Sequence, residues 1–399
     1  MACGACLWQG ISGYAVIIQT FRKGPYFWSA RPDGNKDIMA TNYESFQSRK
    51  HFAGLDGLRA VAITAVVWHH SAHPDFLPMF ARGFAGVDLF FVLSGFLIVT
   101  LLLREKAREG RISLRNFWAR RLLRLAPAYY LMLFGLLGAY LIFKPGDPDT
   151  ARLAEGFPVY ALYLSNWLHA DANNLSITWS LATEEQFYLI WPLVETFFAP
   201  VAAAGFWVAA LTVNQLVNFG VLDPAINAAF GEGAANSREI LDSTFTPILL
   251  GVGLAHLLHR EQGYLLAQRI AGFKHAPLVY ALALLALFNI PAADISGAFR
   301  LAMHLLMTAW IASIVLAPGA KITSALDWRP VAFIGAVSYG MYLYHMWCVH
   351  VARTLLTKLS LPNVWLEFPI ALVATIAVSA ASFYLYEKRF LDLRKRFRK

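Results

Sequence analysis

Arg59 and His70 are the residues whose types and spacing most directly suggest chemistry in this sequence. Both lie in GLDGLRAVAITAVVWHH, at the beginning of the first long apolar stretch. Eleven helical positions rise about 16 Å and turn about 1100°, which leaves the two side chains ~20° apart around the helix. An imidazole can act as a general base near neutral pH, and ionisable groups within a membrane span usually face a cavity. The structural alternative is that Arg59 extends to the headgroups and His70 makes a polar contact between helices.

The histidines beside His70 raise two further hypotheses. Asp75 follows His70 by five positions, the H-x-x-x-x-D spacing with which soluble glycerolipid acyltransferases orient a base. Only two residues match this spacing, so coincidence is the simpler explanation. His69 and His73 are four positions apart and could bind a metal ion. The sequence places no third ligand near them, and we predict no metal site.

Three arginines in FWARRLLRLAPAYY could bind an anion at the cytoplasmic entrance of a helix. They are Arg120, Arg121 and Arg124. A guanidinium group offers paired donors that match the oxygens of a phosphate. The excess of Lys and Arg in cytoplasmic loops of membrane proteins would also account for them.

Carboxylates also occur within the apolar segments. Glu184 and Glu185 are adjacent in ITWSLATEEQFYLIWPL, and because neighbouring side chains project about 100° apart, we expect at most one of them to face the interior. Such a carboxylate needs a partner, and by depth in the membrane His70 is a nearer candidate than Arg59. The alternative is that the carboxylate lies in the outer headgroup region. We expect Asp88, at the outer end of the second span, to pair with a cation such as Arg82 or to face the cavity.

Further polar side chains could line the same interior, although helix packing accounts for them as well. The candidates are Ser94, Tyr188, Ser338, Tyr339, Tyr342 and His345. The glycines near Ser94 allow helices to approach closely; they are Gly83, Gly86 and Gly95.

The composition places these residues in a membrane protein. Hydrophobic residues make up 58% of the 399 positions and charged residues 15%, well below the quarter that is usual in soluble domains. The net charge of +9 comes from cations beside the apolar segments, where anionic lipid or a polyanionic cosubstrate would attract them. Nucleic acid is therefore not expected as a partner. The three cysteines predict neither a disulfide framework nor a zinc site.

The chain is predicted to be all-α and polytopic, with about ten membrane spans and both termini in the cytoplasm. The loop 104–124 carries eight Lys and Arg, and the tail from Lys388 carries seven, so both fit the cytoplasmic side. An outer loop at 144–178 is expected to hold a re-entrant or interfacial helix near 159–168. The predicted spans are 57–77, 84–103, 127–143 (opened by Pro127), 180–198, 203–222, 244–259, 276–291, 299–316, 331–354 and 366–386.

We predict two parts in the chain. Residues 1–48 form an N-terminal extension that is unlike the rest of the chain, and Met39 is an alternative start. Residues 49–399 form the transmembrane domain. No internal repeat is visible, and the two halves lack the matching broken helices that a transporter with inverted repeats would show.

Six motifs occur in one order and resemble the membrane-bound acyltransferase 3 family, whose members O-acylate carbohydrates. They are GLDGLRA followed by a histidine, with ten residues between arginine and histidine, GVDLFFVLSGFLI, RRLLRLAPAYY, WSLATEEQFYLIWPL, SYGMYLYH and YEKRF, and they cover about residues 50–395. Arg59 and His70 match the family's arginine-x10-histidine motif. The arginines at 120, 121 and 124 match its basic motif, and Glu184 matches its carboxylate in span four. Two departures are His69, where the family usually has an aromatic or apolar residue, and EKRF in place of EKPF.

The resemblance implies a ten-span bundle in a bacterial inner membrane that transfers an acyl group from cytoplasmic acyl-CoA to a hydroxyl. His70 would be the general base, and burial and Arg59 would favour its neutral form; a covalent acyl-histidine is the variant. The basic motif would bind the CoA phosphates, Glu184 would orient a polar partner, and Ser94 and Gly95 would let the thioester approach. No permanently bound cofactor is expected.

The resemblance leaves the acceptor open among lipopolysaccharide sugars, exopolysaccharide, a glycolipid, a lipid-linked intermediate and a small metabolite. Acetyl is the expected group, and the oligomeric state is undetermined. Because the chain ends at the basic tail, we expect any outer hydrolase-like domain of the kind fused to some relatives to be a separate protein.

Two other classes of protein share these features. A transporter or exporter of a sugar-lipid or a small anion would line its path with the same polar residues. A structural subunit of an export complex would have little use for so many buried ionisable groups. Dependence on CoA separates the classes, because a transporter consumes no thioester.

Overall fold

A computed structural model describes residues 43–49, 51–74, 76–168, 175–231, 244–292 and 295–397. Within these ranges every regular element is a helix and no strand occurs, which confirms the all-α prediction. Met39, Asp75 and most of the predicted N-terminal extension lie outside the described residues. Residues 42–399 form one compact unit.

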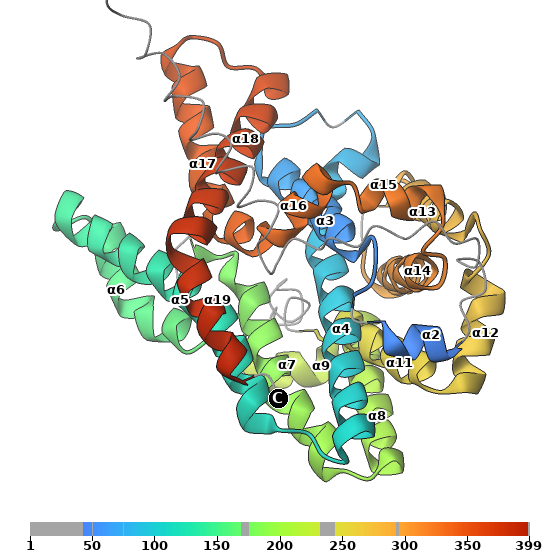
Figure 1. Ribbon diagram of the computed structural model, residues 1–399. Helices are drawn as coiled ribbons and strands as arrows, with labels where there is room; N and C mark the ends of the chain where they lie inside the picture. Colours follow the sequence, from blue (N-terminus) through green and yellow to red (C-terminus); the bar gives the residue numbers. More distant parts are fainter. Residues whose placement is uncertain are drawn as a thin grey trace, which may run out of the picture. The chain divides into compact units, whose positions relative to one another are not determined.

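Figure 1 shows the helices of the described residues. In chain order they are α2 (Tyr43–Ser48), α3 (Leu55–His70), η1 (Pro78–Arg82), α4 (Ala85–Glu109), α5 (Leu114–Phe143), α6 (Pro148–Ala161), α7 (Thr178–Phe197), α8 (Pro200–Asn218), α9 (Asp223–Phe230), α11 (Thr246–His259), α12 (Glu261–Ala271), α13 (Ala276–Phe288), α14 (Gly297–Leu316), α15 (Lys321–Leu326), α16 (Arg329–Ala336), α17 (Ser338–Lys358), α18 (Val364–Ser382), the π-helical turn η4 (Phe383–Glu387), α19 (Lys388–Leu393) and η5 (Arg394–Phe397).

The helices α3 and α4 form the centre of the bundle. The most extensive contact in this centre joins α4 to α11, where a Cβ added at Gly95 would lie 2.1 Å from the carbonyl oxygen of Ile248. Gly83 and Gly86 are equally close to backbone atoms of α3, so the predicted packing role of these glycines is confirmed. The expected approach of a thioester at Gly95 is wrong, because α11 occupies that side of the glycine.

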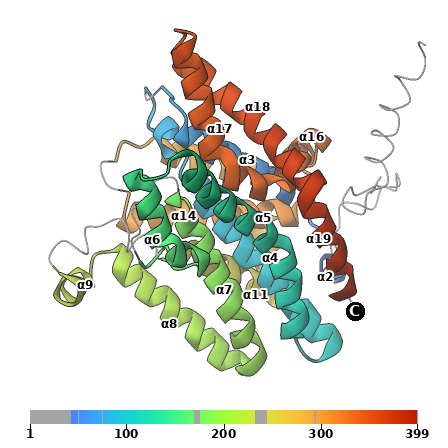
Figure 2. The same cartoon turned by 90° about the vertical axis from the view of Figure 1, so that its left-hand side faces the viewer.

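The last two long helices, α17 and α18, pack against each other as a hairpin, and both also contact α3 (Figures 1 and 2). The N-terminal half of α3 packs on α16 at a second close approach, where a Cβ at Gly335 would lie 1.8 Å from the carbonyl oxygen of Asp56. Glycines thus let α3 approach its neighbours on two sides, which holds Arg59 and His70 on a helix with little freedom to move.

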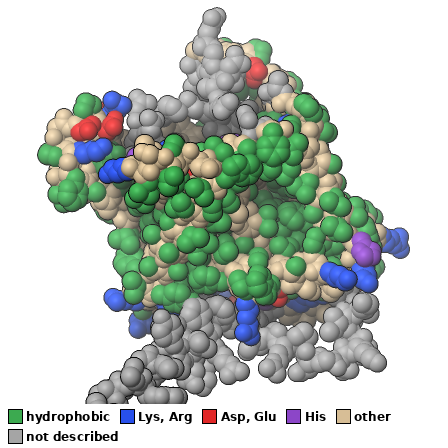
Figure 3. Space-filling view, turned by 90° about the horizontal axis from the view of Figure 1, so that it is seen from above, with side chains coloured by type: hydrophobic (Ala, Val, Ile, Leu, Met, Phe, Trp, Pro, Cys, Tyr) green, Lys and Arg blue, Asp and Glu red, His purple; other side chains and the backbone are tan. Residues whose placement is uncertain are grey.

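A helix overlaps each of the ten predicted spans. Among the residues that the structure describes, five helices are long and apolar enough to cross a membrane: α4, α5, α8, α14 and the continuous segment Val364–Phe397. The pair α12 and α13, bent by 68°, would make a sixth span. The protein is therefore a multi-pass membrane protein, and Figure 3 shows one face where hydrophobic side chains predominate and charged ones lie near the borders. The full number of crossings stays a prediction.

Three boundaries differ from the predicted ones. Helix α5 begins at Leu114, so Pro127 lies inside the helix instead of opening it; hydropathy marks the apolar part of a helix, whereas this helix continues into its basic segment. Span nine is divided between α16 and α17. The helix expected near 159–168 is α6, which begins at Pro148 and ends at Ala161, with turns after it. Its first half is amphipathic, and hydropathy alone does not distinguish such a segment from a loop.

Candidate functional site

The imidazole of His70 lies at the C-terminal end of α3 and is held by its own helix. Its Nδ1 lies 3.0 Å from the carbonyl oxygen of Val66, and because a carbonyl can only accept, Nδ1 carries the proton in the neutral ring. The lone pair therefore lies on Nε2. This is the tautomer that a general base requires when it acts through Nε2.

A second imidazole faces the first from α17. The ring centroids of His345 and His70 are 4.9 Å apart, and the ring planes are inclined at 62° in an edge-to-face arrangement. The Nδ1 of His345 donates to the carbonyl oxygen of Tyr342 at 2.7 Å, while its Nε2 is buried and has no hydrogen-bond partner. The structure thus brings together two residues that the sequence assigned separately to catalysis and to the cavity. His69 lies beside His70 but packs against Phe84.

The N-terminal end of α3 contributes to a group of arginines. Arg59 donates to Asp56 at 2.7 Å, and its charge also acts on Arg121 and Arg124 of α5. The tail adds Arg394, whose charge acts on Arg124 as well. We call Arg59, Arg121, Arg124 and Arg394 the arginine cluster. The carboxylates that interact with it are Asp56, Glu184, Glu185 and Glu387.

Glu184 connects α7 to this cluster. The hydroxyl of Ser94 donates to its Oε1 at 2.6 Å, and the hydroxyl of Tyr188 donates to Ser94 at 3.0 Å. Arg121 completes the arrangement, with its guanidinium 4.7 Å from the centroid of the Tyr188 ring. The sequence suggested three different roles for these residues, whereas the structure joins Glu184, Ser94 and Tyr188 by hydrogen bonds and places Arg121 over the Tyr188 ring.

The predicted pairing of Glu184 with His70 is wrong. The charges that act on Glu184 come from Arg121 and Arg59, and His70 is surrounded by other histidines. Depth in the membrane predicted the partner, but the direction in which a side chain leaves its helix decides which neighbour it reaches.

Arg120 does not join the arginine cluster. Its guanidinium lies 3.3 Å from the carboxylate of Glu105 and donates to the carbonyl oxygen of Phe397 at 3.0 Å. Of the three arginines in the predicted basic motif, only Arg121 and Arg124 therefore act together. Their three-residue spacing places them on one side of α5.

Asp88 belongs to a different cluster, between α4 and α14. Its Oδ1 lies 3.3 Å from Nε2 of His304, and both side chains are almost fully buried. The expected pairing with Arg82 is wrong, because Arg82 donates to the carbonyl oxygens at the end of α13 and just beyond it, from 2.8 to 3.1 Å. The last carbonyls of a helix lack donors within the helix, and the guanidinium of Arg82 is occupied by this helix end, where one of the three carbonyls also accepts the backbone N–H of Ile290.

The polar residues of α17 mostly bond to the backbones of neighbouring helices. Tyr339 donates to the carbonyl oxygen of Leu125 at 3.0 Å, and Tyr342 donates to that of Ile177 at 2.9 Å. Ser338 is buried at the start of the helix. Of this predicted stripe, His345 alone points to His70, and the packing explanation fits the tyrosines.

Sequence reasoning missed one ion pair next to His70. Arg353 of α17 and Glu367 of α18 are joined by Nη2 and Oε1 at 2.7 Å. An available signal was a cation and a carboxylate near the two facing ends of consecutive apolar segments, separated only by the short connection 359–363. Helices joined by a short loop pack antiparallel, which would have predicted the contact.

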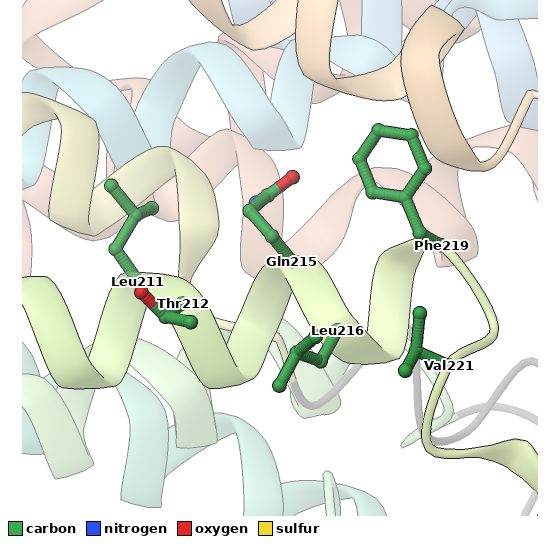
Figure 4. Close-up of a pocket in the computed structure, with 6 residues that line it drawn as sticks. All are labelled: Leu211, Thr212, Gln215, Leu216, Phe219 and Val221. Atoms are coloured by element: carbon green, nitrogen blue, oxygen red, sulfur yellow. The ribbon is translucent and has the colours of Figure 1, made fainter.

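The described part of the chain has no candidate metal site beside these residues. No group of three or more His, Cys, Asp or Glu side chains within those residues could hold a metal ion. An apolar depression lies on α8 and the turn after it (Figure 4), lined by Leu211, Thr212, Gln215, Leu216, Phe219 and Val221. None of the site residues lines it, and its surface suits lipid chains.

Known proteins resemble this chain over most of its length. It is 30% identical over 370 residues to YrhL of Bacillus subtilis, which is provisionally named a peptidoglycan O-acetyltransferase; the match covers 87% of this chain and 56% of YrhL. It is 31% identical over 323 residues to the O-acetyltransferase OatA of Staphylococcus aureus, covering 76% of this chain and 51% of OatA. The peptidoglycan O-acetyltransferase OatA of Listeria monocytogenes is 29% identical, with 85% of this chain and 56% of that protein covered.

The chain therefore spans about half the length of these relatives. No solved structure matches it. The sequence model of the family described as the acyltransferase domain, Acyl_transf_3, matches residues 52–384. That range includes the His70–His345 pair, Glu184 and all of the arginine cluster except Arg394. This chain belongs to the acyltransferase 3 family.

Proposed function

We propose that this protein is an integral-membrane acyltransferase that moves an acyl group, with acetyl the simplest case, from acyl-CoA to a hydroxyl group of a carbohydrate. Family membership and the names of the relatives support acyl transfer. The observation that carries the proposal is that two different groups of residues lie at the two ends of α3: the arginine cluster at its N-terminal end and the His70–His345 pair at its C-terminal end. Arg59 and His70 are about 16 Å apart along the helix axis. This separation suits a cosubstrate whose phosphates lie far from its thioester.

The orientation follows from charge. Ten crossings would place the N-terminal end of α3, the arginine cluster and the basic tail on the cytoplasmic side, where acyl-CoA is found, and would put both termini there. The C-terminal end of α3 would then face the opposite side, where an envelope carbohydrate is available. In a bacterium this membrane is the inner membrane.

The arginine cluster would hold the donor. Four guanidinium groups that repel one another are stabilised by a bound polyanion, and each can offer paired donors to a phosphate. Arg59, Arg121 and Arg124 remain partly exposed to solvent, so they are accessible to a ligand. Arg59, which the sequence suggested as a catalytic partner of His70, would instead act at the donor end.

His70 would act as the base. Its free Nε2 would take the proton of the acceptor hydroxyl as the oxygen attacks the thioester carbonyl; the C–O bond forms, the C–S bond breaks, and the proton passes to the departing thiolate. The alternative path begins with attack of an imidazole nitrogen on the thioester, which forms a C–N bond, breaks the C–S bond and releases the CoA thiolate; the acceptor hydroxyl then attacks the acyl-histidine, forming the C–O bond, breaking the C–N bond and leaving its proton on the imidazole or the thiolate. Glu184 would keep Ser94 and Tyr188 in place beside the path between the two ends.

The acceptor proposed here is a hydroxyl of an envelope polysaccharide. The relatives named for peptidoglycan support this class, and a glycolipid or lipid-linked sugar would present the same chemistry. The proposed partners are thus acyl-CoA, a carbohydrate acceptor and the surrounding lipids.

The test measures free thiol released from acetyl-CoA by purified protein in nanodiscs, with and without a membrane glycan extract. We expect glycan-dependent release that His70→Ala abolishes and His69→Ala retains; this neighbouring histidine is the matched control. Normal release by a folded His70→Ala protein would refute the role of His70. If the wild-type protein releases no thiol with any acyl-CoA or extract, the proposal fails and transport becomes the better explanation.

A further inference from the structure

The ion pair between Arg353 and Glu367 joins an exposed guanidinium to a buried carboxylate through several hydrogen bonds. Nε of Arg353 lies 3.2 Å from both carboxylate oxygens of Glu367, and Nη2 lies 2.7 Å from Oε1. The residue Glu367 is only 5% exposed. Burying a carboxylate between apolar helices is costly unless it is paired and hydrogen-bonded, so this geometry calls for a reason beyond solubility.

The pair also reaches the end of α3. The same Oε1 of Glu367 accepts the backbone N–H of Ala72 at 2.8 Å, and Nη2 of Arg353 donates to the carbonyl oxygen of His70 at 3.4 Å. The last carbonyls of a helix have no partner within the helix. Here one of them, and the first backbone N–H beyond the C-cap Ser71, are bound by side chains of α17 and α18.

These contacts connect the two histidines. His345 and Arg353 lie on the same helix, eight positions or about 12 Å apart, and Arg353 and Glu367 fasten the turn that carries His70 to that helix. The ring of His70 is in turn bonded to Val66 one turn back in α3. The distance between the two imidazoles, 4.9 Å between centroids, therefore depends on how the end of α3 is held.

We propose that Arg353 and Glu367 are positioning residues that hold the C-terminal end of α3 against α17 and so fix His70 for proton transfer. The inference rests on the function proposed above. Misplacing a catalytic group by 1 Å can cost about 100-fold in rate. A simpler account is that the pair only stabilises the α17–α18 hairpin, and the two accounts differ in what they predict for donor binding.

The experiment compares Glu367→Gln, Arg353→Met and Arg353→Lys in the full chain in nanodiscs. For each variant we would measure acetyl-CoA binding, kcat for acetyl transfer and Tm. Because the arginine cluster lies at the other end of α3, we expect unchanged acetyl-CoA affinity with kcat lowered about 10–100-fold in Glu367→Gln and Arg353→Met. Arg353→Lys retains a donor and a charge, and should recover much of that loss.

Two controls separate position from folding. Asp149→Asn removes an exposed ion pair to Arg152 on α6 and should change none of the three quantities. The double variant Arg353→Leu/Glu367→Met removes both charges at once, which avoids leaving one buried charge unpaired. It should therefore fold, bind acetyl-CoA and show the same loss of kcat.

A double variant that folds and transfers acetyl at the wild-type rate would overturn the inference. So would parallel losses of kcat, acetyl-CoA affinity and Tm in the single variants, since this is the result of a general weakening of the hairpin. An inactive wild-type protein would instead overturn the proposed function, and with it this inference.

Discussion

The close contact between α4 and α11 predicts opposite effects for the same substitution at two glycines. Gly95 of α4 and Gly135 of α5 both lie inside helices long enough to cross a membrane. A Cβ at Gly95 would lie 2.1 Å from the carbonyl oxygen of Ile248, whereas a Cβ at Gly135 would have no atom within 4 Å. Because Gly95 meets backbone atoms, no side chain can move aside to make room.

The magnitudes come from two contributions. Alanine is favoured over glycine inside a helix by about 1 kcal/mol at both positions. Overpacking costs about 1–3 kcal/mol, and contact with backbone places Gly95 at the upper end. We therefore expect Gly95→Ala to lower the free energy of unfolding by about 2 kcal/mol and Gly135→Ala to raise it by about 1 kcal/mol. With an unfolding entropy of about 2.1 cal/mol/K per residue, 2 kcal/mol corresponds to a fall in Tm of about 2–3 °C.

The assay is the Tm of both variants and the wild type in the same nanodiscs, followed by thiol release from acetyl-CoA. Ser94 precedes Gly95, so a displaced α4 should also disturb its 2.6 Å hydrogen bond to Glu184 and lower transfer. If Gly95→Ala is as stable as Gly135→Ala, α4 and α11 do not approach as closely as described, and the reasoning fails.

Two further substitutions test the two ends of the bundle. Arg124→Gln should raise the KM for acetyl-CoA about 10–100-fold, the equivalent of one charge-assisted hydrogen bond, while kcat changes little. The control is Arg115→Gln, which replaces an exposed arginine of the same helix. Equal KM values in both variants would contradict the proposed donor site. Arg82→Gln should lower the free energy of unfolding by about 3 kcal/mol, since three carbonyl oxygens lose a donor; an unchanged Tm would show that this helix end is satisfied without Arg82.

Local signals in the sequence predicted the elements of this protein well. Apolar segments of the right length indicated a helix at each of the ten predicted positions, because burial in lipid requires every backbone group to bond within its own segment. The boundaries were less accurate where a helix continues beyond its apolar part, as α5 does before Pro127. Hydropathy indicates which part of a helix lies in lipid, whereas the backbone hydrogen bonds of the helix can continue beyond that part.

The sequence predicted several residues of the candidate site, but not which of them contact one another. The spacing of Arg59 and His70 selected α3, and the carboxylate motif selected Glu184. The sequence nevertheless paired Glu184 with His70, whereas the structure surrounds it with Ser94 and arginines. Two residues on different helices make contact only if the helices have the right relative position along their axes and the right rotation about them. Neither quantity can be predicted from the sequence of one helix.

By itself the sequence determined an all-helical membrane protein, the helix that carries Arg59 and His70 and, through its ordered motifs, the family. The tertiary structure alone decided that α3 has two chemically different ends, that His345 faces His70, and that Arg353 and Glu367 hold the end of α3. The physical reason is the range of the interactions. Helix formation and lipid burial depend on neighbours within about twenty residues of one chain segment, whereas these contacts join positions separated by up to 295 residues and exist only after the helices have packed.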